Sequence, residues 1–301
     1  MNTVMVIGGL PESLINFRGD LIDSLVARSD RVVAMSAPAT EEIKLALKQK
    51  GAEFCAFDIR RNGLNPLSDL KILIQLSVMF RKVKPDVALA YTIKPVVWGG
   101  LAARFTRTDF VALITGLGYA FQGEGFKRRC LTWLVRKLYS VSLRSAKVVL
   151  FQNKDNAELF IRLGIIEEER ICIVNGSGVN IEHYDVVPIP ALAPKQLNFL
   201  CVARLLKEKG LFEYATAAQI VKQRYPAAKF RLVGPLDPSP DAISLKDVEE
   251  WTAIDYLGEK KDVRPELVDC HVYVLPSYHE GLPRSSLEAM SIGRPVITTN
   301  A

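Results

Sequence analysis

Short apolar runs bounded by turn residues recur along the chain, and longer segments with a helical spacing of apolar positions separate them. In the first half we expect strands at residues 4–7, 31–35, 87–90, 110–114, 148–151 and 171–174. These runs are apolar enough to be buried on both faces, as the strands of a parallel sheet are. The pattern therefore predicts an α/β domain built from alternating strands and helices.

Two helices of this domain can be placed from local signals. We expect a loop at residues 8–18 and a helix at 19–27. A second helix is predicted at 40–51, because Thr40 can cap its start and the acidic residues that follow suit the positive end of a helix dipole.

A proline-rich stretch at residues 185–197 divides the chain, because proline continues neither a helix nor a central strand. We expect a first domain at 1–184, a linker at 185–197 and a second domain at 198–301. The second domain repeats the pattern, with strands expected at 199–203, 230–233, 254–257, 272–275 and 295–298 and helices at 211–224 and 285–291. Because the sequence stops soon after a strand, the second domain is expected to be truncated; the alternative is a small but complete domain.

Composition restricts the partners. The chain carries 39 Lys and Arg against 33 Asp and Glu, a formal net charge of +6, which favours anions such as nucleotide or lipid phosphates. No Cys-x-x-Cys pair indicates a zinc or redox site, and the start of the chain lacks the basic region of a signal peptide. The longest apolar stretch, 87–103, is interrupted by Lys94, Pro95 and a glycine pair, so we expect a cytoplasmic protein without a transmembrane helix.

The segment HEGLPRSSLEAM at residues 279–290 carries the most chemical information. Glu280 lies in the loop after an expected strand, and Glu288 lies about one turn into the next helix. Open α/β sheets bind ligands at the carboxyl ends of their strands, and a helix N-terminus there suits a phosphate. A carboxylate can accept hydrogen bonds from two neighbouring sugar hydroxyls. Isolated glutamates are more often surface charges, but the Gly281-Leu282-Pro283 turn favours a site.

The segment ARLLKEKG at residues 203–210 follows another expected strand. Arg204 offers a forked contact and Lys209 a mobile point charge, and the two could converge on a diphosphate. Basic residues in such a loop are otherwise ordinary solvated surface.

These two segments, together with Val233-Gly234-Pro235, Tyr256-Leu257-Gly258 and Ile15-Asn16-Phe17-Arg18-Gly19, resemble glycosyltransferase family 4, in the group that extends undecaprenyl-diphosphate-linked sugars. The resemblance covers nearly the whole chain. It implies a GT-B fold, with two Rossmann-like domains facing a cleft, and a retaining transfer from a UDP-linked sugar. Relatives continue past the position of Ala301, and relatives commonly have Asp where this chain has Asn180.

The resemblance also assigns roles to matching residues. Glu280, Arg204 and Lys209 would be the catalytic groups, with Glu280 on the donor sugar and the two cations on the diphosphate. Glu288 would hold the donor ribose, with Gly8, Gly9, Gly281, Leu282 and Pro283 completing the donor site. No metal or cofactor is expected, and no catalytic base is assigned.

On the acceptor side the resemblance points to loops after strands of the first domain. The candidates are Arg18, Lys94 and Tyr119.

Gly8 and Gly9, on the donor side, let the backbone approach a ligand closely, although an ordinary tight turn explains them equally well.

The stretch from Lys127 to Lys147 is basic, contains no acid and includes Trp133 among its apolar residues. Such a helix can lie on an anionic membrane, which suits a lipid-linked saccharide acceptor and a peripheral location on the inner face of the cytoplasmic membrane. The same helix could instead pack on a sheet and solvate its charges. Nucleic acid is a poorer fit, because no known nucleic-acid-binding module accompanies the charge.

Three other functions compete with this one. A nicotinamide-dependent oxidoreductase should show Gly-x-Gly-x-x-Gly after the first strand, and Gly8-Gly9-Leu10-Pro11 does not supply it. A sugar-nucleotide epimerase of the same architecture is harder to exclude. The third is an inactive fragment that still associates with membranes.

Overall fold

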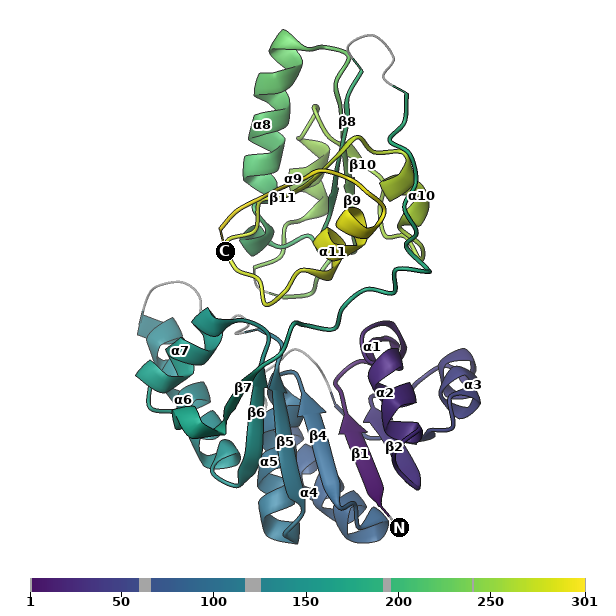
Figure 1. Ribbon diagram of the computed structural model, residues 1–301. Coiled ribbons are helices and arrows are strands. Elements are labelled where there is room, and N and C mark those ends of the chain that lie inside the picture. Colours follow the sequence, from purple (N-terminus) through teal and green to yellow (C-terminus); the bar gives the residue numbers. More distant parts are fainter. Residues whose placement is uncertain (1, 60–65, 117–125, 192–195, 240, 301) are drawn as a thin grey trace. The chain divides into compact units, whose positions relative to one another are not determined.

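The computed structural model describes residues 2–59, 66–116, 126–191, 196–239 and 241–300 (Figure 1). The chain divides into two compact units, Met1–Ser177 and Gly178–Ala301. The linker expected at 185–197 falls inside the range of the second unit. Each unit is an α/β structure around a parallel sheet, as the sequence predicted.

The first unit contains a seven-stranded sheet with the order β3-β2-β1-β4-β5-β6-β7. Its strands are β1 (Thr3–Ile7), β2 (Arg31–Ser36), β3 (Glu53–Ala56), β4 (Val87–Tyr91), β5 (Asp109–Ile114), β6 (Ala146–Phe151) and β7 (Ile171–Ile173). Every pairing between neighbours is parallel.

Two sets of helices cover the two faces of this sheet (Figure 1). On one face α1 (Pro11–Asn16), α2 (Gly19–Val26) and α3 (Glu41–Gln49) bury Leu14, Ile22 and Leu47 against β1 and β2. On the other face lie α4 (Pro66–Val83), α5 (Ile93–Thr106), α6 (Phe126–Leu143) and α7 (Lys154–Arg162). A short 3-10 turn, Glu168–Arg170, precedes β7.

One local prediction was wrong. We expected a loop at residues 8–18, but Pro11–Asn16 form helix α1. Pro11 stands in the first turn, where its missing N–H costs nothing, and Leu14 is fully buried against the sheet. Tertiary burial therefore stabilises a helix too short to be recognised from its periodicity.

The second unit contains a five-stranded parallel sheet with the order β10-β9-β8-β11-β12. Its strands are β8 (Asn198–Val202), β9 (Lys229–Val233), β10 (Asp255–Tyr256), β11 (Val272–Leu275) and β12 (Val296–Thr298). Its helices are α8 (Leu211–Arg224), α9 (Leu245–Glu249), α10 (Arg264–Val268) and α11 (Arg284–Ser291), with a 3-10 turn at Lys207–Lys209. Both sheets reverse their strand order at one place, between β1 and β4 and between β8 and β11. Open α/β sheets bind ligands in the crevice outside the carboxyl ends of the strands at such a place.

The segment that enters the second unit is fixed to it by Arg294, whose side chain is buried. The Arg294 guanidinium donates to the backbone oxygens of Val187 and Pro188 and to those of Leu267 and Val268. The Ser291 hydroxyl also donates to the Tyr184 carbonyl, at 2.6 Å. Residues 184–188 are therefore part of the second unit's packing.

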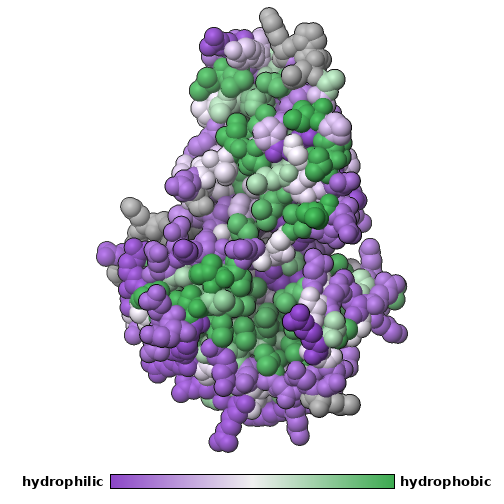
Figure 2. Space-filling model, in the orientation of Figure 1, coloured by the Kyte–Doolittle hydropathy of each residue, from purple (hydrophilic) through white to green (hydrophobic). Residues whose placement is uncertain are grey.

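Apolar side chains reach the surface in both units, among hydrophilic ones (Figure 2). In the described part of the chain, none of the helices is long and apolar enough to cross a membrane.

Candidate functional site

The loops after β8 and β11 meet at the point where the strand order of the second sheet reverses. The Tyr278 backbone N–H donates to the Glu208 carbonyl at 2.9 Å and joins the two loops. Gly210 has a φ of +66°, and a Cβ atom at that position would lie 2.0 Å from the Pro276 carbonyl oxygen. Only glycine allows this approach.

Lys209 and Glu280 face each other across this junction. The Lys209 ammonium lies 2.7 Å from a Glu280 carboxylate oxygen, and both side chains are largely buried. The Ser277 hydroxyl donates to the same oxygen at 2.7 Å. The structure thus brings together two of the three expected catalytic residues, which are 71 positions apart in the sequence.

Arg204, the third expected catalytic residue, pairs with a different acid. Its guanidinium donates to Asp237, in the loop after β9, at 2.5 Å. Burial alone would raise the pKa of Asp237, but hydrogen bonds from Ser239 and Arg204 lower it below its ordinary value. The sequence prediction missed Asp237, although its position after Val233-Gly234-Pro235 was a usable signal.

Glu288 lies in the second turn of α11 and is only 8% exposed. Arg284, one turn earlier, donates to it at 2.9 Å, and the Tyr184 hydroxyl is hydrogen-bonded to it. Burial raises the pKa of Glu288 above its ordinary value, although the Arg284 charge and these hydrogen bonds oppose the shift. Tyr184 was not expected at this site, and no local signal indicated it, because it comes from the segment before β8.

The N-terminus of α11 follows the turn formed by Gly281, Leu282 and Pro283. Pro283 is the N-cap residue and makes no side-chain capping bond. Within the described chain, the buried Ser286 hydroxyl has no hydrogen-bond partner. A helix N-terminus of this kind can bind an anion through its first backbone N–H groups.

The first unit places a second group of expected residues around Tyr91, at the end of β4. A Cβ atom at Gly8 would lie 2.3 Å from the Tyr91 hydroxyl, so Gly8 is required by this packing. The Ser13 hydroxyl is 2.8 Å from the same oxygen, and the Arg18 guanidinium lies over the Tyr91 ring, 5.0 Å from its centroid. Arg18 is 5% exposed.

Gly9 lies close to Thr92, the single residue between β4 and α5. The nearest atom to a Cβ built on Gly9 would be the Thr92 hydroxyl oxygen, at 3.4 Å. Thr92 has a φ of +68°, which is rare for a β-branched residue and often marks a functional crevice.

The remaining two acceptor-side candidates differ. Lys94 pairs with Asp69 of α4 at 2.9 Å, with both side chains 14% exposed. Tyr119 lies outside the described residues. Within the described chain, no group of three His, Cys, Asp or Glu side chains could hold a metal ion.

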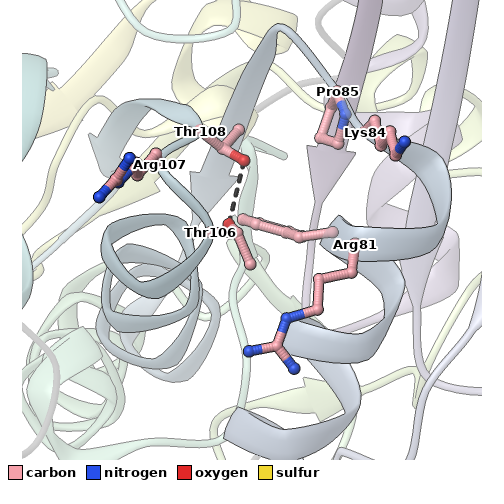
Figure 3. Close-up of a pocket in the computed structure, with 7 residues that line it drawn as sticks. Arg81, Lys84, Pro85, Thr106, Arg107 and Thr108 are labelled. Atoms are coloured by element: carbon pink, nitrogen blue, oxygen red, sulfur yellow. Dashed lines mark hydrogen bonds between the residues drawn. The ribbon is translucent and has the colours of Figure 1, made fainter.

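A separate hollow of about 390 Å³ lies where α4 and α5 end, next to the starts of β4 and β5 (Figure 3). It is therefore at the opposite edge of the first sheet from Gly8 and Tyr91. Its lining residues are Phe80, Arg81, Lys84, Pro85, Thr106, Arg107 and Thr108.

Two family models match this chain. Residues 196–301 match "Glycosyl transferases group 1", and residues 21–153 match "Glycosyl transferase 4-like". The chain is 30% identical over 299 residues to the N,N'-diacetylbacillosaminyl-diphospho-undecaprenol alpha-1,3-N-acetylgalactosaminyltransferase of Campylobacter jejuni, which covers 96% of this chain and 78% of the relative. It is 26% identical over 253 residues to the UDP-Gal:alpha-D-GlcNAc-diphosphoundecaprenol alpha-1,3-galactosyltransferase of Escherichia coli, which covers 79% of this chain and 64% of that relative.

Solved structures share the fold. Anabaena Alr3699/HepE in complex with UDP-glucose superposes with a TM-score of 0.74 at 19% identity, over 100% of this chain and 81% of that one. A UDP-N-acetylglucosamine 2-epimerase superposes with a TM-score of 0.62 at 13% identity, over 100% of this chain and 80% of that one. An epimerase therefore shares the fold of this chain, and the fold alone does not distinguish a transferase from an epimerase.

Proposed function

Because the chain belongs to glycosyltransferase family 4, we propose that it transfers a sugar from a UDP-linked donor to a saccharide carried on undecaprenyl diphosphate. The observation that carries the proposal is the junction of the loops after β8 and β11, where Lys209 and Glu280 meet at 2.7 Å. The printed names of the two relatives supply the substrate class: both act on diphosphate-linked undecaprenol, and one uses UDP-Gal.

Three parts of the second unit bind three parts of the donor: its ribose, its diphosphate and its sugar. The Glu288 carboxylate accepts hydrogen bonds from the two ribose hydroxyls, while Arg284 and Tyr184 keep it oriented. The uncapped N-terminus of α11 and the Ser286 hydroxyl bind the diphosphate. Glu280 holds hydroxyls of the transferred sugar.

The reaction replaces one bond to the sugar's anomeric carbon. The bond from that carbon to the UDP oxygen breaks, and the electron pair leaves with UDP. The acceptor hydroxyl oxygen forms the new bond and gives its proton to the departing phosphate. Arg204 and Lys209 stabilise the negative charge that develops on the diphosphate, which is a strong source of catalysis. This chemistry needs neither a metal nor another cofactor.

The stereochemistry is proposed to be retaining. Both relatives' printed names specify an alpha linkage. An alpha-linked UDP sugar gives an alpha product only when the configuration of the anomeric carbon is kept. In the first unit we assign Arg18 and Thr92, the N-cap residue of α5, to the acceptor side. Lys94 could bind the acceptor only while it is also paired with Asp69.

The location follows from the acceptor. An acceptor anchored by undecaprenol stays in the bilayer, so we propose that the protein is peripheral on the inner face of the cytoplasmic membrane. The basic stretch from Lys127 to Lys147 contributes to that attachment, because its exposed residues include Trp133 and Lys137.

A transfer assay tests the function. The chain is incubated with radiolabelled UDP sugars, one at a time, and with undecaprenyl-diphosphate-linked saccharides, and both released UDP and label in the lipid fraction are measured. The proposal expects equal amounts of the two products for one donor. Interconversion of the UDP sugars without UDP release would identify an epimerase and overturn it.

A further inference from the structure

The loop after β8 is joined to the loop after β9 as well as to the loop after β11. The Leu205 N–H donates to the Pro235 carbonyl at 3.0 Å. A Cβ atom at Gly234 would overlap the Ala203 carbonyl oxygen, so only glycine allows the two loops to approach this closely. The backbone on both sides of Arg204 is therefore fixed against the neighbouring loop.

The side chain of Arg204 is held along one edge and open along the other. Its Nη1 donates to the Asp237 carboxylate at 2.5 Å. Within the described residues, neither Nε nor Nη2 makes a hydrogen bond, and the side chain is 36% exposed. The guanidinium therefore has a fixed direction and keeps N–H groups that a ligand can reach.

Asp237 is itself fixed and is closed to solvent. Its side chain is only 5% exposed. One carboxylate oxygen accepts from the Ser239 backbone N–H at 2.9 Å, and the other accepts from Arg204. A carboxylate so covered does not touch a substrate, so any effect of Asp237 on ligand binding passes through Arg204.

An arginine that is oriented beforehand binds an anion more tightly than one that rotates freely. A long side chain loses rotamer entropy when a ligand immobilises it. Because Asp237 already orients the Arg204 guanidinium, most of that entropy is lost on folding instead. Competition between Asp237 and an anionic ligand for the same donor is the opposite effect, but Nε and Nη2 remain available to the ligand.

We propose that Asp237 is a positioning residue, which orients Arg204 so that its remaining N–H groups bind the phosphate next to the transferred sugar. The inference rests on the proposed function, because Arg204 is assigned there to the donor diphosphate. The negative charge on that phosphate grows as its bond to the sugar breaks. A preset orientation of the guanidinium therefore contributes most in the transition state.

Calorimetric titration of UDP and of UMP into the folded chain tests the inference, because UMP lacks the phosphate that Arg204 is proposed to bind. D237A should weaken UDP binding roughly fivefold, the cost of ordering one long side chain, and leave UMP binding unchanged. D237N keeps an oxygen that can accept from Arg204 or from Ser239, so its loss should be intermediate. Thermal unfolding of each variant establishes that it is folded.

A double-mutant cycle shows whether Asp237 acts through Arg204. R204M should weaken UDP binding at least as much as D237A does, and D237A/R204M should bind UDP as R204M does, because the positioned group is already gone. D237N and D237N/R204M repeat the comparison with a side chain of the same shape, which covers a D237A chain that fails to fold.

D255N is the matched control for the loss of an acid. Asp255 is exposed at the start of β10, and the starts of parallel strands lie at the opposite edge of the sheet from the loops that hold Arg204. D255N should therefore bind UDP and UMP as the wild type does.

Kinetics give a second measurement. In the transfer assay, D237A should lower kcat for the UDP sugar by a larger factor than it raises KM, because the charge on the diphosphate is greatest in the transition state. An unchanged kcat would contradict the positioning role.

Three binding results would overturn the inference. Equal losses for UDP and UMP would give Asp237 a structural role only, and tighter UDP binding by D237A would mean that it competes with the diphosphate. Additive losses in D237A/R204M would mean that it does not act through Arg204. A folded wild type that binds no UDP would refute the proposed function together with the inference, whereas UDP binding that D237A leaves unchanged would refute the inference alone.

Discussion

At the scale of single residues, the raised pKa of Glu288 predicts how donor binding depends on pH. The carboxylate must be ionised to accept hydrogen bonds from both ribose hydroxyls, and burial raises its pKa. Its protonation therefore begins at a higher pH than for an ordinary glutamate. The affinity for a UDP sugar should be constant at neutral pH and fall about tenfold on acidification, the cost of losing a hydrogen bond to a charged group. Calorimetric titrations over a pH series measure this; a UDP sugar is preferred to UDP, whose terminal phosphate itself titrates.

Tyr184 predicts a shift of that pH profile. Its hydroxyl lowers the pKa of Glu288 by hydrogen bonding to the carboxylate. Tyr184→Phe keeps the ring but loses this bond, so the fall in affinity should begin at a higher pH than in the wild type. Glu288→Gln should bind weakly at every pH and show no fall. A Tyr184→Phe profile that superposes on the wild type would refute the assigned hydrogen bond.

The sequence predicted residue types better than residue pairs. Glu280, Lys209 and Glu288 could be placed near strand ends, because loop positions follow from the order of strands and helices. Their partners could not: Lys209 and Glu280 are 71 positions apart, and Tyr184 reaches Glu288 from another segment. Such pairings depend on strand order and on side-chain directions, which a single sequence does not specify.

At the scale of elements, Gly210 predicts how closely the loops after β8 and β11 must approach. Gly210→Ala should destabilise the second unit by the cost of a left-handed alanine, about 1 kcal/mol, plus roughly 1–3 kcal/mol for the overlap with Pro276. Gly258→Ala is the matched control, because Gly258 also has a positive φ, +72°, but nothing lies within 4 Å of its missing Cβ. Thermal unfolding should show a clearly larger loss for Gly210→Ala; equal losses would mean that the loops do not need this contact.

The helices show which local signals are informative. The helix predicted at 40–51 is α3, and the Thr40 hydroxyl accepts from the Ile43 N–H as a cap should. Helix α1 was missed because its six residues are too few to show a periodicity, and only burial stabilises it. Helix α4 has apolar residues on its buried side and others, such as Ile74 and Val78, on its exposed side. Its periodicity therefore does not reveal which side is buried.

At the scale of the whole molecule, the contacts of Arg294 predict that the second unit can be destabilised without an effect on the first. Its guanidinium donates hydrogen bonds to the carbonyls of residues 187–188 and to those of Leu267 and Val268 in α10. Arg294→Met leaves these acceptors buried without partners, at roughly 1–3 kcal/mol for each group that water does not reach. Scanning calorimetry should show a lower unfolding temperature for the second unit and no change for the first. Lys246→Met, an exposed substitution on α9, should change neither.

The overall architecture was predictable because two series of alternating strands and helices require two parallel sheets. The sequence does not establish where one unit ends, since the proline-rich stretch that suggests a linker is also the segment that Arg294 binds. The structure divides the chain between Ser177 and Gly178, ahead of that stretch.

The proposed function requires that the joined loops and α11 of the second unit bind a nucleotide-sugar donor. Calorimetric titration of UDP into the folded chain, and into Glu288→Ala and Lys209→Ala, tests it most directly. We expect one saturable site per chain and an affinity at least tenfold lower in each variant, because each variant loses a hydrogen bond to a charged group. No saturable binding by the folded wild type, or wild-type affinity in both variants, would refute donor binding at this site.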